Sequence, residues 1–279
     1  MSELEIRKYA AFSYQGEGGN PAGVALVEEF PADEVMMRIA AEVGFSETVF
    51  AKRTEGGFRV RYFSPDSEVD FCGHATLALG FALFEQFGAG EYALALNHAR
   101  IQVATDNEGK VTLSSPSTHS RALPSDQKAR YQALFGLYAE DLNDAIPMAI
   151  GNGGNDHLVI ALNSRQKLAQ MAYDFEKAKV AMQQDKLVTV ALLYRESAGL
   201  IHIRNAFAFG GVYEDPATGA AAAAVTGYLR DLGKLDFKNG TASIEYRQGF
   251  DMGTPCVLEV TAGEEKGGSV LISGWVRQL

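Results

Sequence analysis

The hydrophobic pattern of the chain changes sharply at two places, where an extended segment gives way to an apolar helix. Residues 58–63 alternate apolar and charged side chains with a period of two, which predicts a half-buried strand. Residues 75–84 then carry Ala, Leu, Gly and Phe on every face, which is typical of a helix enclosed by other structure. Downstream, residues 205–209 and an acidic loop precede the five alanines of 220–224. Both places therefore predict a buried helix that follows a strand and a polar loop.

The two predicted helices begin near Gly73 and Gly219, which lie 219 − 73 = 146 residues apart in a chain of 279. A spacing close to half the chain indicates an internal repeat, so we predict two pseudo-symmetric domains. A chain of this length is long enough for each domain to bury a core. We place the domains at residues 1–118 and 119–279, with a polar linker at 117–125. The C-terminal strand is a candidate to cross to the first domain.

Most of the remaining chain is strand-like, with few helices. A helical stripe over residues 32–43 ends at Gly44, where a glycine C-cap is expected, and shorter helical patterns cover 127–135 and 175–184. The other strand-like runs are 6–12, 92–96, 101–105, 111–115, 146–150, 157–162, 188–194, 200–205, 243–248, 257–260 and 270–276. Many strands among few helices predict an α+β fold, in which curved mixed or antiparallel sheets surround the two buried helices.

Composition and charge limit the classes of partner. The formal net charge of −10 argues against sequence-independent nucleic-acid binding, which needs a basic surface, and it also disfavours membrane surfaces. No run has the apolar length of a membrane span, and the charged residues 1–8 lack the apolar stretch of a signal peptide. Two cysteines are too few for a disulfide framework. We therefore expect a soluble cytoplasmic protein with reduced thiols, whose partner is a small molecule.

The first turns of the two predicted helices are the candidate sites for chemistry. Free backbone N–H groups and the helix dipole at such a start bind a carboxylate or another anion. Gly73 would let a ligand approach the backbone closely, and Cys72 and His74 flank it. Glu47 lies at the expected start of a strand, where a carboxylate can be partly buried and tuned as a proton carrier. Asn20 is a candidate to reach the same cleft.

Each of these features also has a purely structural interpretation. The first helix start would then be an ordinary buried one with a satisfied histidine, and the alanines would only let the second helix lie close to a sheet. The glycine-rich residues 16–23 would form a hairpin loop, and Glu47 would be solvated. The other histidines and Cys256 show no ligand spacing, and no H-E-x-x-H or C-x-x-C motif occurs, so we predict no metal site.

Five motifs, in the same order along the chain, resemble the phenazine-biosynthesis-type (PhzF-like) isomerase family, which shares the fold of diaminopimelate epimerase. The motifs are Gly19-Asn20-Pro21-Ala22, Phe45-Ser46-Glu47-Thr48, Asp70-Phe71-Cys72-Gly73-His74-Ala75-Thr76, Glu214-Asp215-Pro216-Ala217-Thr218-Gly219 and Gln248-Gly249-Phe250-Asp251-Met252-Gly253. The resemblance implies two similar domains, each a curved sheet round a central helix, with the active site between them. It also implies that the protein needs no cofactor and is commonly a homodimer.

Carried over by motif position, the resemblance implies that Glu47 is the catalytic acid/base and that His74 and Asp215 contact the substrate. Backbone N–H groups at both helix starts would hold the substrate carboxylate. The substrate-binding residues that we assign are Asn20, Ser46, Cys72, Gly73, Ala75, Thr218, Gly219 and Ala220. Ala220 departs from the family pattern, because many relatives have Ser there, and this change removes a possible hydroxyl contact.

The favoured function is a cofactor-independent isomerase that moves a proton from a carbon next to an unsaturated system in a small carboxylic acid. His74 should act as a neutral imidazole, because a helix N-terminus disfavours the imidazolium. The main rival is a two-base racemase or epimerase, which is disfavoured because Thr218 stands where a second thiol would be needed. A Cys–His nucleophile is disfavoured because residues two apart on a helix do not face each other. A ligand-binding protein without turnover is the third class.

Overall fold

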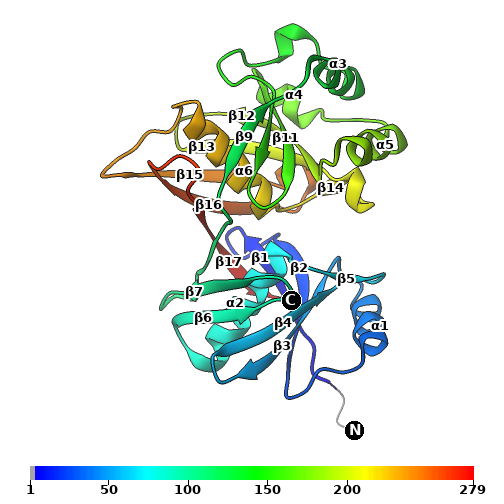
Figure 1. Cartoon of the computed structure of the whole chain (residues 1–279), viewed down its shortest axis with the longest axis vertical. Helices are drawn as coiled ribbons and strands as arrows, with labels where there is room; N and C mark the ends of the chain where they lie inside the picture. Colours follow the sequence, from blue (N-terminus) through cyan, green and yellow to red (C-terminus); the bar gives the residue numbers. More distant parts are fainter. Residues whose placement is uncertain (1–3) are drawn as a thin grey trace. The chain divides into compact units, whose positions relative to one another are not determined.

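The chain forms two compact units in a computed structural model, which describes residues 4–279 (Figure 1). The first unit comprises residues 4–114 and 273–279, and the second comprises Ser115–Ile272. The first three residues of the charged N-terminal segment lie outside the described residues. Among the described residues, no helix combines the length and the apolar character that a membrane span requires.

Strands enclose one long helix in the first unit. Its elements are β1 (Arg7–Ser13), β2 (Asn20–Val27), α1 (Asp33–Val43), β3 (Thr48–Thr54), β4 (Gly57–Phe63), β5 (Glu68–Val69), α2 (Gly73–Phe87), β6 (Gly90–Ala95), β7 (Arg100–Thr105) and β8 (Val111–Ser114). Helix α2 begins at Gly73, as predicted, and it contacts β1, β2, β3, β7 and β8. Helix α1 ends at Gly44, whose φ of 78° is the left-handed conformation expected of a C-cap glycine.

The second unit contains four helices and most of the remaining strands. Its elements are β9 (His119–Ala122), α3 (Ser125–Leu134), β10 (Ala149–Asn152), β11 (Asp156–Leu162), α4 (Arg165–Ala169), α5 (Phe175–Asp185), β12 (Thr189–Arg195), β13 (Leu200–Ala206), β14 (Glu214–Asp215), α6 (Gly219–Asp231), β15 (Thr241–Gln248) and β16 (Cys256–Gly263). Strand β17 (Val270–Gln278) begins in this unit and ends in the first. Helix α6 begins at Gly219, as predicted, and contacts β9, β10, β11 and β16.

The two units use the same succession of strand pairings. In the first unit β2 and β3 are parallel, β3 and β4 antiparallel, β4 and β5 antiparallel, and β4 and β6 parallel. In the second unit the pairs β11–β12, β12–β13, β13–β14 and β13–β15 repeat these directions in the same order. Each central helix therefore follows a two-residue strand, β5 or β14, that pairs antiparallel with the strand before it. Mixed sheets, as expected for the α+β class, are present in both units.

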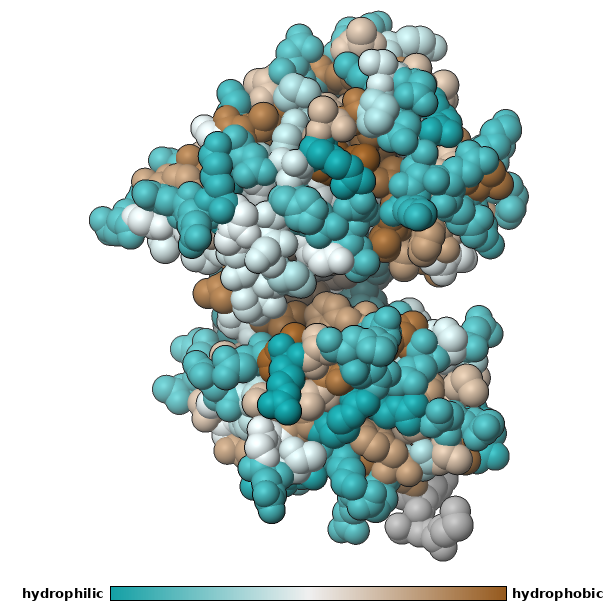
Figure 2. Space-filling model, viewed as in Figure 1, coloured by the Kyte–Doolittle hydropathy of each residue, from teal (hydrophilic) through white to brown (hydrophobic). Residues whose placement is uncertain are grey.

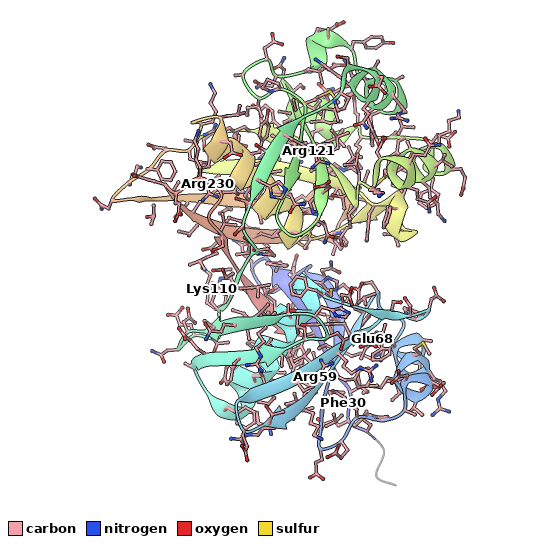
Figure 3. The ribbon with its side chains drawn as sticks, in the orientation of Figure 1. Phe30, Arg59, Glu68, Lys110, Arg121 and Arg230 are labelled. Carbon is pink, nitrogen blue, oxygen red and sulfur yellow. The ribbon has the colours of Figure 1, made fainter. Side chains whose placement is uncertain are left out.

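The polar segment 117–125 is not a linker, and that prediction is wrong. Residues 119–122 form β9, which pairs antiparallel with β10, and α3 begins at Ser125. Thr118 is buried, and its hydroxyl accepts a hydrogen bond over 2.6 Å from the guanidinium of Arg230, a residue of α6 that Figure 3 labels. A strand whose side chains are mostly exposed needs only main-chain pairing, so a polar composition does not exclude it.

The alanine run of α6 lets this helix lie close to β10. A Cβ added to Gly151 would come within 2.9 Å of the Ala224 carbonyl oxygen, and one added to Gly153 within 2.8 Å of the Ala220 oxygen. Small residues on both elements therefore bring the two backbones together. The interpretation that the alanines let the second helix lie close to a sheet is therefore confirmed.

The visible face of each unit is covered mainly by hydrophilic side chains, with hydrophobic ones scattered among them (Figure 2). Some of the large hydrophobic residues that are exposed lie just before the predicted site residues of the two helix starts. Phe71, with 40% of its surface exposed, comes before Cys72 and α2, and Val212 and Tyr213 come before β14. Exposed apolar side chains thus lie close in sequence to both sets of predicted site residues.

Candidate active site

Glu47 and His74 come together in the first unit, as the resemblance implied for a shared site. Glu47 ends the loop between α1 and β3, and its carbonyl oxygen accepts a hydrogen bond from the Gly23 N–H over 3.2 Å. Its Oε2 lies 3.3 Å from Nε2 of His74, which stands on the first turn of α2. Oε2 is buried, and no hydrogen bond with good geometry reaches it within residues 4–279. Ser46 completes the group, with Oγ 3.4 Å from the same Nε2.

Cys72 and His74 also face each other, which corrects the argument made from their spacing. The Cys72 Sγ lies 3.3 Å from Nδ1 of His74 and 3.8 Å from Nε2. Cys72 is the N-cap of α2 and has φ −140° and ψ 115°, so its backbone is extended. The rule that residues i and i+2 point apart applies to two helical residues, and only His74 is helical here. The structure therefore places a thiol, an imidazole and a carboxylate in one cluster.

The backbone that carries this cluster is fixed from both sides. The Thr76 hydroxyl donates a hydrogen bond to the Cys72 carbonyl over 2.7 Å and lies 2.7 Å from the Tyr62 hydroxyl. Burial raises the pKa of Tyr62 above its usual value, so this phenol keeps its proton. Upstream, Glu68 of β5 accepts two hydrogen bonds from Arg61 and one from Asn97 (Figure 3 labels Glu68). These contacts hold the segment between β5 and α2.

The first turn of α2 offers backbone donors next to the cluster. The first intrahelical bond runs from the Thr76 N–H to the Cys72 carbonyl, so the N–H groups of residues 73–75 have no acceptor within the helix. A Cβ added to Gly73 would meet no atom within 4 Å, which leaves room for a ligand above the backbone. The Ala75 side chain is fully buried, so its backbone N–H is the group that can serve a ligand.

Asp215 and Thr218 come together in the second unit. The Thr218 hydroxyl donates a hydrogen bond to Oδ2 of Asp215, and Thr218 is the N-cap of α6. Gly219 is buried and Ala220 half-buried in the first turn of the helix. The earliest intrahelical bond here joins the Ala222 N–H to the Thr218 carbonyl, so the N–H groups of residues 219–221 have no helical acceptor.

Gln248 connects the parts of this second cluster, and the sequence analysis gave it no role. Its Nε2 donates to the Asp215 carbonyl over 2.7 Å and to the Thr218 hydroxyl over 3.0 Å. Its Oε1 accepts the Thr218 N–H over 3.1 Å, and the residue is fully buried. The sequence signal was available, because the period of β15 places Gln248 on the same buried face as Ile244 and Tyr246.

A buried ion pair fixes β14 just before Asp215. Arg204 of β13 donates two hydrogen bonds to the Glu214 carboxylate, one of them from Nε to Oε1 over 2.9 Å, and a third to the Ala169 carbonyl. Both side chains are at least nine-tenths buried. Since Asn205 of β13 pairs with Asp215 of β14, the ion pair and the strand ladder fix the same short segment.

Asn20 is placed at a strand start, not in the loop suggested by the glycines around it. It is buried and begins β2, opposite Ala11 of β1. β2 runs parallel to β3 with Gly23 opposite Thr48, so Asn20 and Glu47 belong to the same end of this strand pair. The expectation that Asn20 serves the site stays a prediction.

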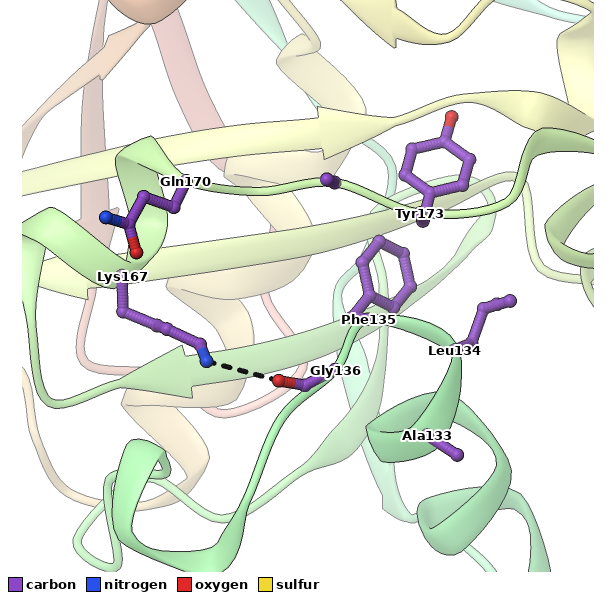
Figure 4. A pocket seen from close by; sticks show the side chains of 8 residues that line it. Ala133, Leu134, Phe135, Gly136, Lys167, Gln170 and Tyr173 are labelled. Carbon is purple, nitrogen blue, oxygen red and sulfur yellow. Dashed lines mark hydrogen bonds between the residues drawn. The ribbon is translucent and has the colours of Figure 1, made fainter.

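A separate cavity in the second unit involves none of the predicted residues. It measures about 550 Å³ and is lined by α3, α4 and the segments that follow them, including Phe135, Lys167 and Tyr173 (Figure 4). The Lys167 ammonium is already engaged, because it donates to the Gly136 carbonyl over 3.1 Å and lies 3.0 Å from Asp141. This cavity brings no acid/base pair together, so the two helix starts are the better candidates for chemistry.

Comparison with known proteins agrees with the motifs. A relative named as uncharacterized isomerase YfhB from Bacillus subtilis is 28% identical over 280 residues, covering 96% of this chain and 93% of its own. An uncharacterized isomerase from Deinococcus radiodurans is 32% identical, over 90% of this chain and 84% of its own. The crystal structure of a Bacillus anthracis phenazine biosynthesis protein of the PhzF family superposes with a TM-score of 0.88 at 22% identity, covering 100% and 98% of the two chains, and so shows the same fold.

The family model described as phenazine biosynthesis-like protein (PhzC-PhzF) matches residues 9–276, which is nearly the whole chain and includes every predicted site residue. The expectation drawn from the five motifs is therefore confirmed at the level of the family. The chain belongs to the PhzC-PhzF family of phenazine biosynthesis-like proteins.

Proposed function

We propose that the protein is an isomerase that shifts a proton within a small carboxylic acid, with Glu47 as the acid/base and with no cofactor. The family and the relatives named as isomerases support the reaction class. One observation carries the role of Glu47: its Oε2 is buried beside His74, and no hydrogen-bond donor is aligned with it within the described chain. Such an oxygen keeps its lone pairs available for a proton taken from a bound substrate.

The neighbours of Glu47 supply the other parts of a proton shift. His74 lies beside both Glu47 and Cys72, so the imidazole can exchange a hydrogen bond with a substrate bound next to the carboxylate. The free N–H groups of residues 73–75 bind the substrate carboxylate, with the positive end of the α2 dipole adding to the attraction. Fixed donors of this kind can also stabilise negative charge that develops when the proton leaves carbon.

The proposal also assigns roles to residues of the second unit. Asp215 is held by Thr218 and Gln248, which leaves its carboxylate fixed at the start of α6. We place Asp215 in contact with the substrate and assign carboxylate binding also to Gly219 and the N–H groups that follow. The proposal includes two pseudo-symmetric domains and a homodimer in the cytoplasm. The repeated succession of strand pairings supports the pseudo-symmetry.

The substrate class follows from the residues close to the motifs. Backbone donors at the helix starts favour a carboxylate. The exposed apolar side chains of Phe71 and Val212 favour an adjoining apolar or unsaturated group. We therefore propose a small unsaturated or aromatic carboxylic acid.

A two-base racemase or epimerase is the second candidate, and one contact favours it. Cys72 lies 3.3 Å from the His74 imidazole, so a thiol is available as a further proton carrier in the first unit. The first candidate moves unsaturation and uses Glu47 alone, whereas the second inverts a stereocentre and needs a carrier on each face. The two candidates therefore differ in product.

The test begins with a thermal-shift screen of unsaturated and aromatic carboxylic acids, followed by NMR of mixtures with each stabilising compound. Glu47→Gln should bind such a compound with nearly unchanged affinity but lose turnover by about 100-fold or more, since the amide cannot carry a proton. Glu42→Gln, on the exposed surface of α1, is the matched control and should keep turnover. Normal turnover in Glu47→Gln would remove Glu47 from the mechanism. Binding without product in the wild type would favour a ligand-binding protein.

A further inference from the structure

The Glu47–Cys72–His74 cluster has the composition of a site for a soft divalent cation. One carboxylate oxygen, one sulfur and one ring nitrogen lie within 4.8 Å of one another. These are the three ligand types that zinc sites combine, usually with a water or substrate in the fourth position when the site is open. The sequence analysis missed the set because Glu47 is distant in sequence from the other two residues, and because the Cys-x-His spacing is not a common ligand spacing.

The distances suit such an ion. Bonds of about 2.0–2.3 Å in a tetrahedral zinc site separate the ligand atoms by roughly 3.3–3.6 Å. In the protein, Nε2 of His74 lies 3.3 Å from Oε2 of Glu47 and 3.8 Å from Sγ of Cys72. The sulfur is nearer to Nδ1, at 3.3 Å, so binding through Nε2 requires the Cys72 side chain to rotate toward Glu47.

A second observation points to a ligand at this position. Oε2 of Glu47 is buried, and it lacks a well-aligned hydrogen-bond donor in the described part of the chain. A buried carboxylate oxygen without a donor is costly unless a proton, a substrate or a cation approaches it. His74 is the adjacent group, and an imidazole nitrogen is a common metal ligand.

We propose that Glu47, Cys72 and His74 bind one Zn²⁺ ion and that the ion reversibly inhibits the enzyme. Binding displaces the thiol proton to solvent, and the thiolate and carboxylate together balance the two positive charges of the ion. The charge balance matters because Cys72 caps α2, and the positive end of a helix dipole opposes a cation. Removal of either anionic ligand should therefore weaken binding strongly. The inhibition part of the proposal rests on the proposed function, since the ion occupies the oxygen assigned as the base.

The test uses chelator-treated full-length protein and two probes, Co²⁺ and Zn²⁺. Co²⁺ titration should give one equivalent per chain and a thiolate-to-cobalt charge-transfer band, and Zn²⁺ should abolish that band by displacement. Cys72→Ser should lose the band and bind Zn²⁺ at least about tenfold more weakly by calorimetry. Glu47→Gln should weaken binding similarly. Cys256→Ser is the matched control, because Cys256 is a buried thiol of the second unit, and it should keep both the band and the affinity.

A measurement on the wild type covers the case in which Cys72→Ser does not fold. Zn²⁺ should slow alkylation of Cys72 but not of Cys256, as mapped by mass spectrometry. Absence of saturable Co²⁺ binding, a band that survives in Cys72→Ser, or equal protection of both cysteines would overturn the metal site. Because these measurements need no substrate, they stand apart from the isomerase proposal. Once a substrate is identified, saturating Zn²⁺ that leaves turnover unchanged would overturn the inhibition alone.

Discussion

Acidification should destabilise the second unit through His157, which is buried where β11 begins. Its Nδ1 lies 2.7 Å from the Thr189 hydroxyl, which itself donates a hydrogen bond to Asn205 over 3.1 Å. Thr189 therefore accepts from Nδ1–H, and Nε2 carries the lone pair. Nε2 has no hydrogen-bond partner within the described residues, so protonation would place an N–H there without an acceptor. Burial lowers the pKa of His157 from 6.5 to about 4.

The sign and size of the effect follow from the two pKa values. Above pH 6.5 the imidazole is neutral in both the folded and the unfolded chain, so it contributes no pH dependence. Between pH 6.5 and about 4 the unfolded chain takes up a proton that the folded chain does not. The free energy of unfolding therefore decreases as the pH is lowered through this range. At about 1.36 kcal/mol per pKa unit, the loss should reach about 2.5 kcal/mol at pH 4.5 and level off below pH 4.

The assay compares wild type, His157→Gln and the exposed control His119→Gln between pH 7.5 and 4.5. Hydrogen exchange of peptides from β11 to β13 reports the opening free energy of the second unit, while fluorescence of Trp275 reports on the first unit. His157→Gln should lose stability at pH 7.5, yet it should show a pH dependence smaller by about 2.5 kcal/mol. Parallel pH profiles for wild type and His157→Gln would refute the assignment.

Two further predictions concern the helix starts. Gln248→Ala should lower the free energy of unfolding of the second unit by about 2 kcal/mol or more, because it removes the acceptor of the buried Thr218 N–H and two further hydrogen bonds, to the Asp215 carbonyl and the Thr218 hydroxyl. Denaturant unfolding and turnover, compared with Gln248→Glu, check this. Gly73→Val should fold normally but weaken binding of a carboxylate ligand about tenfold or more, because its side chain enters open space beside the N–H donors. Gly90→Val, also in open space, should bind normally, and equal affinities in both variants would place the anion elsewhere.

Periodicity and turn chemistry predicted the elements that carry the site. The starts of α2 and α6 at Gly73 and Gly219 follow from local signals, since each is a change from a polar loop to an apolar run. The C-cap at Gly44 follows from local chain geometry in the same way. Local signals fail for β9, because a segment with exposed side chains pairs through its backbone and leaves no hydrophobic period.

The parts of the site that were not predicted depend on contacts between distant residues or on backbone conformation. Gln248 and Asp215 are hydrogen-bonded although they lie 33 residues apart in the sequence. Local sequence patterns do not predict which strand ends beside which loop. The Cys72–His74 contact depends on an extended N-cap, which spacing alone cannot distinguish from a helical residue. Its place at a strand start made Glu47 a candidate, motif resemblance implied its acid/base role, and the structure added the contact that links it to His74.

The most direct test of the proposed function is turnover of an identified substrate in D₂O, with NMR and chiral analysis of substrate and product. A single carboxylate can return a proton to another carbon on the same face, so the account predicts a shifted double bond, no loss of optical purity and partial retention of the original hydrogen. Deuterium at the original stereocentre with racemisation, and no shifted product, would contradict the role of Glu47 as the sole proton carrier and establish a two-base epimerase.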